Sequence, residues 1–122
     1  MGHYKDTEAS STNKYPIICI YGESGSGKTT YAKSLKDDNT IILDGDAIRK
    51  YITYDLGYSD IDRYKNNITI AKIAELLYHQ GHKVIISTVK ANIAYDFLKI
   101  RGVETQLIFI NEKHEIITKG DS

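Results

Sequence analysis

The sequence predicts an α/β fold in which helices cover both faces of a parallel sheet of at least four strands. Short apolar, β-branched runs alternate with segments of helical periodicity, which is typical of parallel βαβ units with right-handed crossovers. The first and third runs are apolar on both faces, as in strands of a sheet covered on both sides. With 122 residues, the chain is large enough for one small domain with its own core. We therefore expect a three-layer domain over residues 16–122, preceded by a flexible polar lead-in over residues 1–15.

The expected elements follow one another without an internal repeat. Strands are expected at Pro16–Tyr21, Thr40–Leu43, Val84–Ser87 and Gln106–Ile110, with the first of them at the centre of the sheet. Helices are expected at Thr29–Leu35, Ala47–Ile52, Ser59–Gly81 and Ile93–Ile100. The tail Asn111–Ser122 is mostly polar, with only Ile116 and Ile117 to anchor it.

The longest helix has sequence signals at both ends. Ser59 followed by Asp62 resembles a capping box, and Gly81 suits the position just after a helix end. Apolar residues recur at steps of about one helical turn and predict a buried face: Ile61, Tyr64, Ile68, Ala71, Ala74, Leu77 and Tyr78.

Composition narrows the classes of partner. Lys plus Arg and Asp plus Glu both number 16, and no basic cluster is dense enough to predict a nucleic-acid partner. No signal peptide and no apolar run long enough for a membrane span is found, so we expect a cytoplasmic protein without a membrane partner. The single cysteine, Cys19, falls in the first strand and is expected to be a buried, inert thiol. The four histidines show no metal-ligand spacing.

The stretch GESGSGKTT at residues 22–30 carries the strongest functional signal. It fits the pattern G-x-x-x-x-G-K-[ST] of a P-loop and lies between a predicted strand and a predicted helix, as that pattern requires. Glycines let successive N–H groups face one concavity at a helix N-terminus, where the helix dipole favours a polyphosphate. Lys28 is expected to reach the β- and γ-phosphates, and Thr29 to ligate Mg²⁺. The predicted cofactors are therefore ATP and Mg²⁺, bound by Gly22, Ser24, Gly25, Ser26, Gly27, Lys28, Thr29 and Thr30.

Two carboxylates follow the second predicted strand. Asp44 and Asp46 lie where ligands bind in open α/β sheets, at the carboxyl end of a strand. A kinase needs carboxylates near the P-loop to hold Mg²⁺ and to orient the acceptor hydroxyl. The alternative for Asp46 is a plain N-cap of the helix that contains Arg49.

Further segments resemble adenylylsulfate (APS) kinases, which share an order of motifs. The matching segments read LDGDAIR at 43–49, DLGYS at 55–59, DR at 62–63 with Asn66, IAE at 73–75 and GHKVIIS at 81–87. The resemblance covers about half of the chain. It implies transfer of the ATP γ-phosphoryl group to the 3′-hydroxyl of adenylylsulfate, a small-molecule nucleotide partner. It also implies catalytic roles for Lys28, Asp44 and Asp46, with Thr29 and Asp44 at the metal; how the two carboxylates divide these roles stays open.

The resemblance also implies an acceptor site made of Asp46, Arg49, Tyr58, Arg63, Asn66 and Ser87. Only three of the 16 Lys plus Arg residues are arginine. Because lysine is the usual cation of this chain, arginine at positions 49 and 63 indicates that the bidentate geometry of the guanidinium is needed there. Arg63 and Asn66 are three positions apart and share a helix face; a solvated face is the alternative. Tyr58 replaces the phenylalanine that stacks on the substrate adenine in the family, and a hydrophobic anchor for the loop is the alternative.

Two departures from the family leave rival functions open. The segment after the third strand reads STVKAN at 87–92, so Lys90 and Ala91 replace a serine and a proline. Family members also continue into a basic lid beyond the fourth strand, whereas this sequence stops at Ser122. The rivals are a kinase for another small nucleotide conjugate, such as one used in surface-polysaccharide modification, and a nucleotide-binding protein without catalysis. A homodimer is also open.

Overall fold

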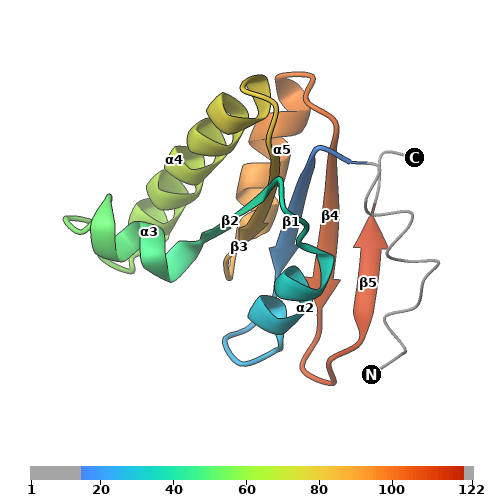
Figure 1. Cartoon of the computed structure of the whole chain (residues 1–122). Helices are drawn as coiled ribbons and strands as arrows, with labels where there is room; N and C mark the ends of the chain where they lie inside the picture. Colours follow the sequence, from blue (N-terminus) through green and yellow to red (C-terminus); the bar gives the residue numbers. More distant parts are fainter. Residues whose placement is uncertain (1–14, 120–122) are drawn as a thin grey trace.

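A computed structural model of the chain describes residues 15–119. Its five strands form one sheet in the order β2-β3-β1-β4-β5, shown in Figure 1. Four are parallel: β1 (Ile17–Tyr21), β2 (Thr40–Asp44), β3 (Lys83–Ser87) and β4 (Thr105–Ile110). The prediction of at least four parallel strands, with the first at the centre, is therefore confirmed. The predicted lead-in lies, apart from Tyr15, outside the described residues, as do residues 120–122.

Helices cover both faces of the sheet, so the domain has three layers (Figure 1). One face carries α2 (Lys28–Leu35). The other carries α4 (Asp60–His79) and α5 (Ala91–Ile100), with α3 (Gly45–Tyr51) packed beside α4. Each predicted helix is present, with its ends moved by at most two residues at either terminus.

Strand β1 separates two hydrophobic cores because its side chains alternate between the faces of the sheet. Ile17 and Cys19 join the core beneath α4 and α5, whereas Ile18 and Ile20 join the core beneath α2. All four are buried, which explains why this run of the sequence is apolar at every position. Burial raises the pKa of the Cys19 thiol, and the charge of Asp96 adds to this shift, so the thiol is inert as expected.

Local capping fixes where α3 and α4 begin. The Asp44 carboxylate accepts a hydrogen bond from the Ala47 N–H at 3.1 Å and is the N-cap of α3, so that helix begins earlier than predicted. Ser59 caps α4 through the Asp62 N–H at 3.1 Å, as predicted. The Asp62 carboxylate binds the Gly57 N–H at 2.8 Å instead of completing the capping box.

The predicted apolar face of α4 is wrong over its first two turns. Ile61 and Tyr64 are 66% and 55% exposed, while the polar residues Asn66 and Asn67 are 0% and 2% exposed. Asn66 bonds to Thr53 just after α3, whereas Ile70, Ala71 and Ala74 of the later turns join the hydrophobic core. The spacing of apolar residues cannot predict this face, because the buried side chains are polar near the start of α4 and apolar farther along it.

The tail after β4 forms a strand that the sequence analysis did not predict. Strand β5 (Ile116–Lys119) pairs antiparallel with β4, and Ile110 faces Ile116 in the register. A hairpin pairs the N–H and C=O groups along the outer edge of β4, and the Ile116 side chain joins the core beneath α2. Within residues 15–119, no helix is both long and apolar enough to cross a membrane.

We predict that Ile108→Val lowers the free energy of unfolding by about 0.5–1.5 kcal/mol, because Ile108 is fully buried in the core beneath α2. The matched control is Ile100→Val at the end of α5, where the side chain is 86% exposed, and its effect should stay within about 0.5 kcal/mol. Urea unfolding followed by circular dichroism measures both values. Equal effects at the two positions would contradict the assignment of Ile108 to the core.

Candidate active site

The parallel strands bring their carboxyl ends to one edge of the sheet. The register pairs Ile20 of β1 with Ser87 of β3, and Ser87 with Asp44 of β2. The P-loop leaves β1 at the same edge. Segments distributed between Ser24 and Lys90 therefore line one cleft of about 550 Å³.

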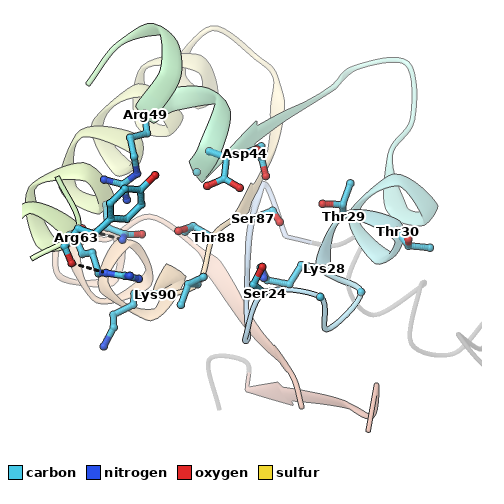
Figure 2. Close-up of a pocket in the computed structure, with 17 residues that line it drawn as sticks. Ser24, Lys28, Thr29, Thr30, Asp44, Arg49, Arg63, Ser87, Thr88 and Lys90 are labelled. Atoms are coloured by element: carbon cyan, nitrogen blue, oxygen red, sulfur yellow. Dashed lines mark hydrogen bonds between the residues drawn. The ribbon is translucent and has the colours of Figure 1, made fainter. Parts of the chain in front are cut away.

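The cleft has two chemically different sides. Figure 2 shows Ser24, Lys28, Thr29 and Thr30 on one side, and Arg49 and Arg63 on the other, with Asp44, Ser87 and Thr88 between them. The lining side chains include four cations (Lys28, Arg49, Arg63 and Lys90) and two carboxylates (Asp44 and Asp46). Four cations against two carboxylates favour an anionic ligand.

The P-loop has the backbone geometry of an anion cradle. Gly25 and Gly27 have φ values of 83° and 100°, in the left-handed region that favours glycine. Gly27 precedes α2, whose first N–H groups have no partner inside the helix. These donors and the helix dipole fit the phosphates of a nucleotide.

Gly22 and Ser26 belong to the P-loop motif but do not line the cleft. A Cβ atom at Gly22 would lie 2.4 Å from the Ile110 carbonyl oxygen, so only glycine lets β1 continue into the loop beside β4. Ser26 is 3% exposed, and its hydroxyl has no hydrogen-bond partner among the described residues. Both residues therefore contribute to the packing and backbone path of the loop and not to the lining of the cleft.

Lys28 folds back over the loop. Its ammonium group donates to the carbonyl oxygens of Gly22 and Glu23, both at 3.0 Å. Burial lowers the pKa of Lys28 from its usual value, while the charges of Asp44, Asp46 and Glu23 oppose this shift, with Asp44 contributing the most of the three. Lys28 lines the same cleft as both carboxylates.

The two carboxylates differ in environment. Asp44 is half-buried and caps α3, while Asp46 is exposed in the first turn of that helix. The alternative of Asp46 as a plain N-cap is therefore wrong, because Asp44 holds that position. Gly45 between them is required by close packing, since a Cβ atom there would lie 2.8 Å from Cβ and Oγ1 of Thr88.

Arg49 and Arg63 both contact Tyr58. The guanidinium carbons lie 4.4 and 5.6 Å from the centroid of the tyrosine ring. Arg49 Nη1 also donates to the Gly57 carbonyl at 2.6 Å, and Arg63 Nε to the Tyr58 carbonyl at 3.0 Å. The tyrosine ring is 65% exposed, so it lines the cleft instead of anchoring the loop in a core.

The structure does not bring Asn66 into the cleft, contrary to the sequence analysis. Its Oδ1 accepts a hydrogen bond from the buried Thr53 hydroxyl at 2.5 Å. The neighbouring Asn67 lines the cleft instead, with Nδ2 donating to the Arg63 carbonyl at 3.0 Å. Because residues four apart share a helix face, the spacing from Arg63 fits Asn67 at least as well as Asn66.

Ser87, which the sequence analysis expects in the acceptor site, lines the cleft. It is 2% exposed, and its hydroxyl has no partner among the described residues. The segment that departs from the family pattern follows directly, and Thr88, Val89 and Lys90 all line the same cleft. The third arginine, Arg101, lies elsewhere and pairs with Glu75.

Comparison with known proteins identifies the family. The family profile described as Adenylylsulphate kinase matches residues 14–116. The chain belongs to this family. It is 36% identical over 115 residues to the adenylyl-sulfate kinase of Bacillus licheniformis, and 34% identical over 117 residues to that of Bacillus pumilus. These matches cover 89% and 91% of the chain but 56% and 57% of the relatives, so the chain spans little more than half their length.

Solved structures agree with the P-loop kinase fold. The structure of the Mycobacterium tuberculosis APS kinase CysC in complex with AMPPNP and APS superposes with a TM-score of 0.68 at 27% identity. That match covers 79% of this chain and 62% of the other. A mutant of the same enzyme has a TM-score of 0.71 at 24% identity, which supports the fold alone, and covers 85% and 80% of the two chains.

We predict that Asp44→Ala lowers the free energy of unfolding by about 1 kcal/mol, because it removes the N-cap of α3. Asp44→Asn is the matched control, since its amide oxygen still accepts from the Ala47 N–H while the charge is lost. Urea unfolding of both variants measures the difference. Equal destabilisation by the two substitutions would mean that the charge of Asp44, and not its cap, stabilises the fold.

Proposed function

We propose that the chain is an ATP-dependent kinase that transfers the γ-phosphoryl group of ATP to the 3′-hydroxyl of adenylylsulfate. The observation that carries the proposal is the single cleft lined by the P-loop, by the carboxylates Asp44 and Asp46, and by the Arg49–Tyr58–Arg63 cluster. Membership of the adenylylsulphate kinase family supports the same reaction. ATP binds through its phosphates at the P-loop, and the acceptor binds on the arginine side.

The P-loop side fits a triphosphate and Mg²⁺. The left-handed glycines, the N-terminus of α2 and Lys28 supply N–H groups and one cation for the phosphates. Thr29 and Asp44 are the proposed metal ligands. Asp44 lines the cleft between the P-loop and the arginine side (Figure 2), and capping α3 through Oδ2 leaves Oδ1 for the ion. When bound, Mg²⁺ neutralises charge on the phosphates.

Asp46 is the proposed base. It is exposed and lines the same cleft as the P-loop and the arginine cluster. Its carboxylate accepts the proton of the acceptor hydroxyl as the new O–P bond forms and the bond to the ADP oxygen breaks. Positioning and charge stabilisation by Lys28, Arg49 and Arg63 supply the remaining catalysis.

The arginine side recognises the acceptor. Arg49 and Arg63 offer guanidinium groups to its sulfate and phosphate, and the exposed ring of Tyr58 offers a stacking surface to its base. Ser87 is a further proposed acceptor residue, because it lines the cleft and its buried hydroxyl has no partner among residues 15–119.

A second candidate is a kinase for another anionic nucleotide conjugate. The observation that favours it is that Thr88, Val89 and Lys90, where the sequence departs from the family pattern, line the cleft. Lys90 adds a cation to the lining that also contains Arg63. Turnover with ATP-Mg²⁺ and a panel of nucleotides bearing a free 3′-hydroxyl separates the two candidates. Faster ADP formation with adenylylsulfate than with any other acceptor supports the first candidate. Faster ADP formation with a different nucleotide supports the second. ATP binding with no ADP formation in the presence of any of the acceptors contradicts both.

We predict that Lys28→Ala abolishes detectable binding of ATP-Mg²⁺ while the protein stays folded, because the ammonium group of Lys28 serves the phosphates and not the core. Lys33→Ala is the matched control, a lysine on the same helix that does not line the cleft. Isothermal titration calorimetry measures affinity, and circular dichroism checks the fold. Undiminished affinity in a folded Lys28→Ala protein would contradict the phosphate cradle.

We also predict that Arg63→Lys lowers kcat/KM for adenylylsulfate by about tenfold or more, because lysine keeps the charge but loses the planar fork. Arg101→Lys is the control, since Arg101 pairs with Glu75 away from the cleft and should leave kcat/KM unchanged. Steady-state kinetics with varied acceptor concentration make the comparison. Equal kcat/KM for Arg63→Lys and the unsubstituted enzyme would assign Arg63 to a solvated helix face.

A further inference from the structure

A histidine from the β4–β5 turn contacts the P-loop. His114 Nδ1 lies 2.7 Å from the carbonyl oxygen of Ser26, although 88 positions separate the two residues in the sequence. A carbonyl oxygen only accepts hydrogen bonds, so Nδ1 carries the proton and donates it. No P-loop pattern requires this contact, because it comes from the segment after β4.

The turn that presents His114 is well ordered by hydrogen bonds. The Asn111 side-chain oxygen accepts from the N–H groups of Lys113 and Glu115, both at 2.9 Å, and its amide donates to the Glu115 carboxylate at 2.8 Å. The His114 N–H donates to the Asn111 carbonyl at 2.9 Å. His114 itself has a φ of 64°, in the left-handed region that residues with a side chain rarely adopt. The turn holds this strained residue directly over the loop.

The contact acts on one peptide group of the P-loop. The peptide between Ser26 and Gly27 is trans, so its C=O and N–H point to opposite sides. With the carbonyl bound by His114, the Gly27 N–H is turned away from the histidine, and Gly27 lines the cleft. The backbone groups on either side of this peptide have partners in the loop and helix. The Ser26 N–H donates to the Glu23 carbonyl, and the Gly27 carbonyl accepts from the Tyr31 N–H. His114 holds the one carbonyl between them.

This peptide needs an external partner because Gly27 permits more than one orientation of it. Glycine adopts positive and negative φ at similar cost, so rotation of the peptide away from the phosphates meets little resistance from Gly27 itself. The Ser26 hydroxyl is buried and has no partner among the described residues. We propose that His114 is a positioning residue that keeps the Gly27 N–H facing the nucleotide phosphates. This inference rests on the proposed nucleotide site.

Three substitutions separate the hydrogen bond from the backbone conformation. His114→Gly tolerates the left-handed φ but has no side-chain donor. His114→Ala has no donor and also disfavours this φ. His114→Asn restores both, because asparagine tolerates this conformation and its Nδ2 is bonded to Cγ as Nδ1 is in histidine. Calorimetric titration with ATP-Mg²⁺ measures the affinity of the full chain and of each variant, and urea unfolding measures stability.

We expect His114→Gly to bind ATP-Mg²⁺ about 3- to 10-fold more weakly, the effect of one hydrogen bond, with stability equal to or above that of the unsubstituted chain. His114→Asn should bind within about twofold of the unsubstituted chain. The chemical shift of the Gly27 amide proton is a second readout, and its change on nucleotide addition should shrink in His114→Gly and return in His114→Asn.

Different results overturn the two proposals. An unsubstituted chain that binds no ATP-Mg²⁺ overturns the proposed nucleotide site itself. If the unsubstituted chain binds ATP-Mg²⁺, and His114→Gly and His114→Ala bind it with the same affinity as the unsubstituted chain, only the role of His114 is overturned. Loss of affinity in all three variants also overturns it, because His114→Asn keeps the donor.

Discussion

The position of β1 between β3 and β4 is the constraint on which the rest of the site depends. A strand hydrogen-bonded on both sides and covered on both faces has a fixed end, so the loop that leaves it starts from a fixed point. The P-loop uses this end to place its N–H groups at the N-terminus of α2. Gly22 makes the exit possible, since any side chain there would collide with the Ile110 carbonyl of β4.

The same sheet edge determines what faces the P-loop. Asp44 ends β2 and Ser87 ends β3, and their register places them at the same level. Asp44 also starts α3, so one side chain both shapes the backbone and adds charge to the cleft. From α3 and α4 come Arg49 and Arg63, which both contact Tyr58. The cleft therefore has a P-loop side and an arginine side with Asp44 between them, an arrangement that fits the proposed phosphoryl transfer.

The largest differences from the sequence prediction lie where polar residues are buried. The first turns of α4 bury Asn66 and Asn67 against α3 and the cleft, and expose Ile61 and Tyr64. Periodicity of apolar residues cannot reveal such a face, because Asn66 is stabilised by a hydrogen bond to Thr53 and not by removal of apolar surface from water. Strand β5 was missed for a related reason. It is four residues long and half polar, and it forms because β4 offers an open edge after a tight turn.

The sequence by itself determined the α/β class, the central P-loop strand, the helix order and the family. These features depend on local signals: apolar runs, a glycine-rich motif, caps and the spacing of charged residues. Only the tertiary structure decided that Asp44 rather than Asp46 caps α3, that Asn67 rather than Asn66 lines the cleft, and that His114 contacts Ser26. Each of these depends on which helix face or hairpin turn comes to lie against another segment, and such contacts form between residues that are distant along the chain.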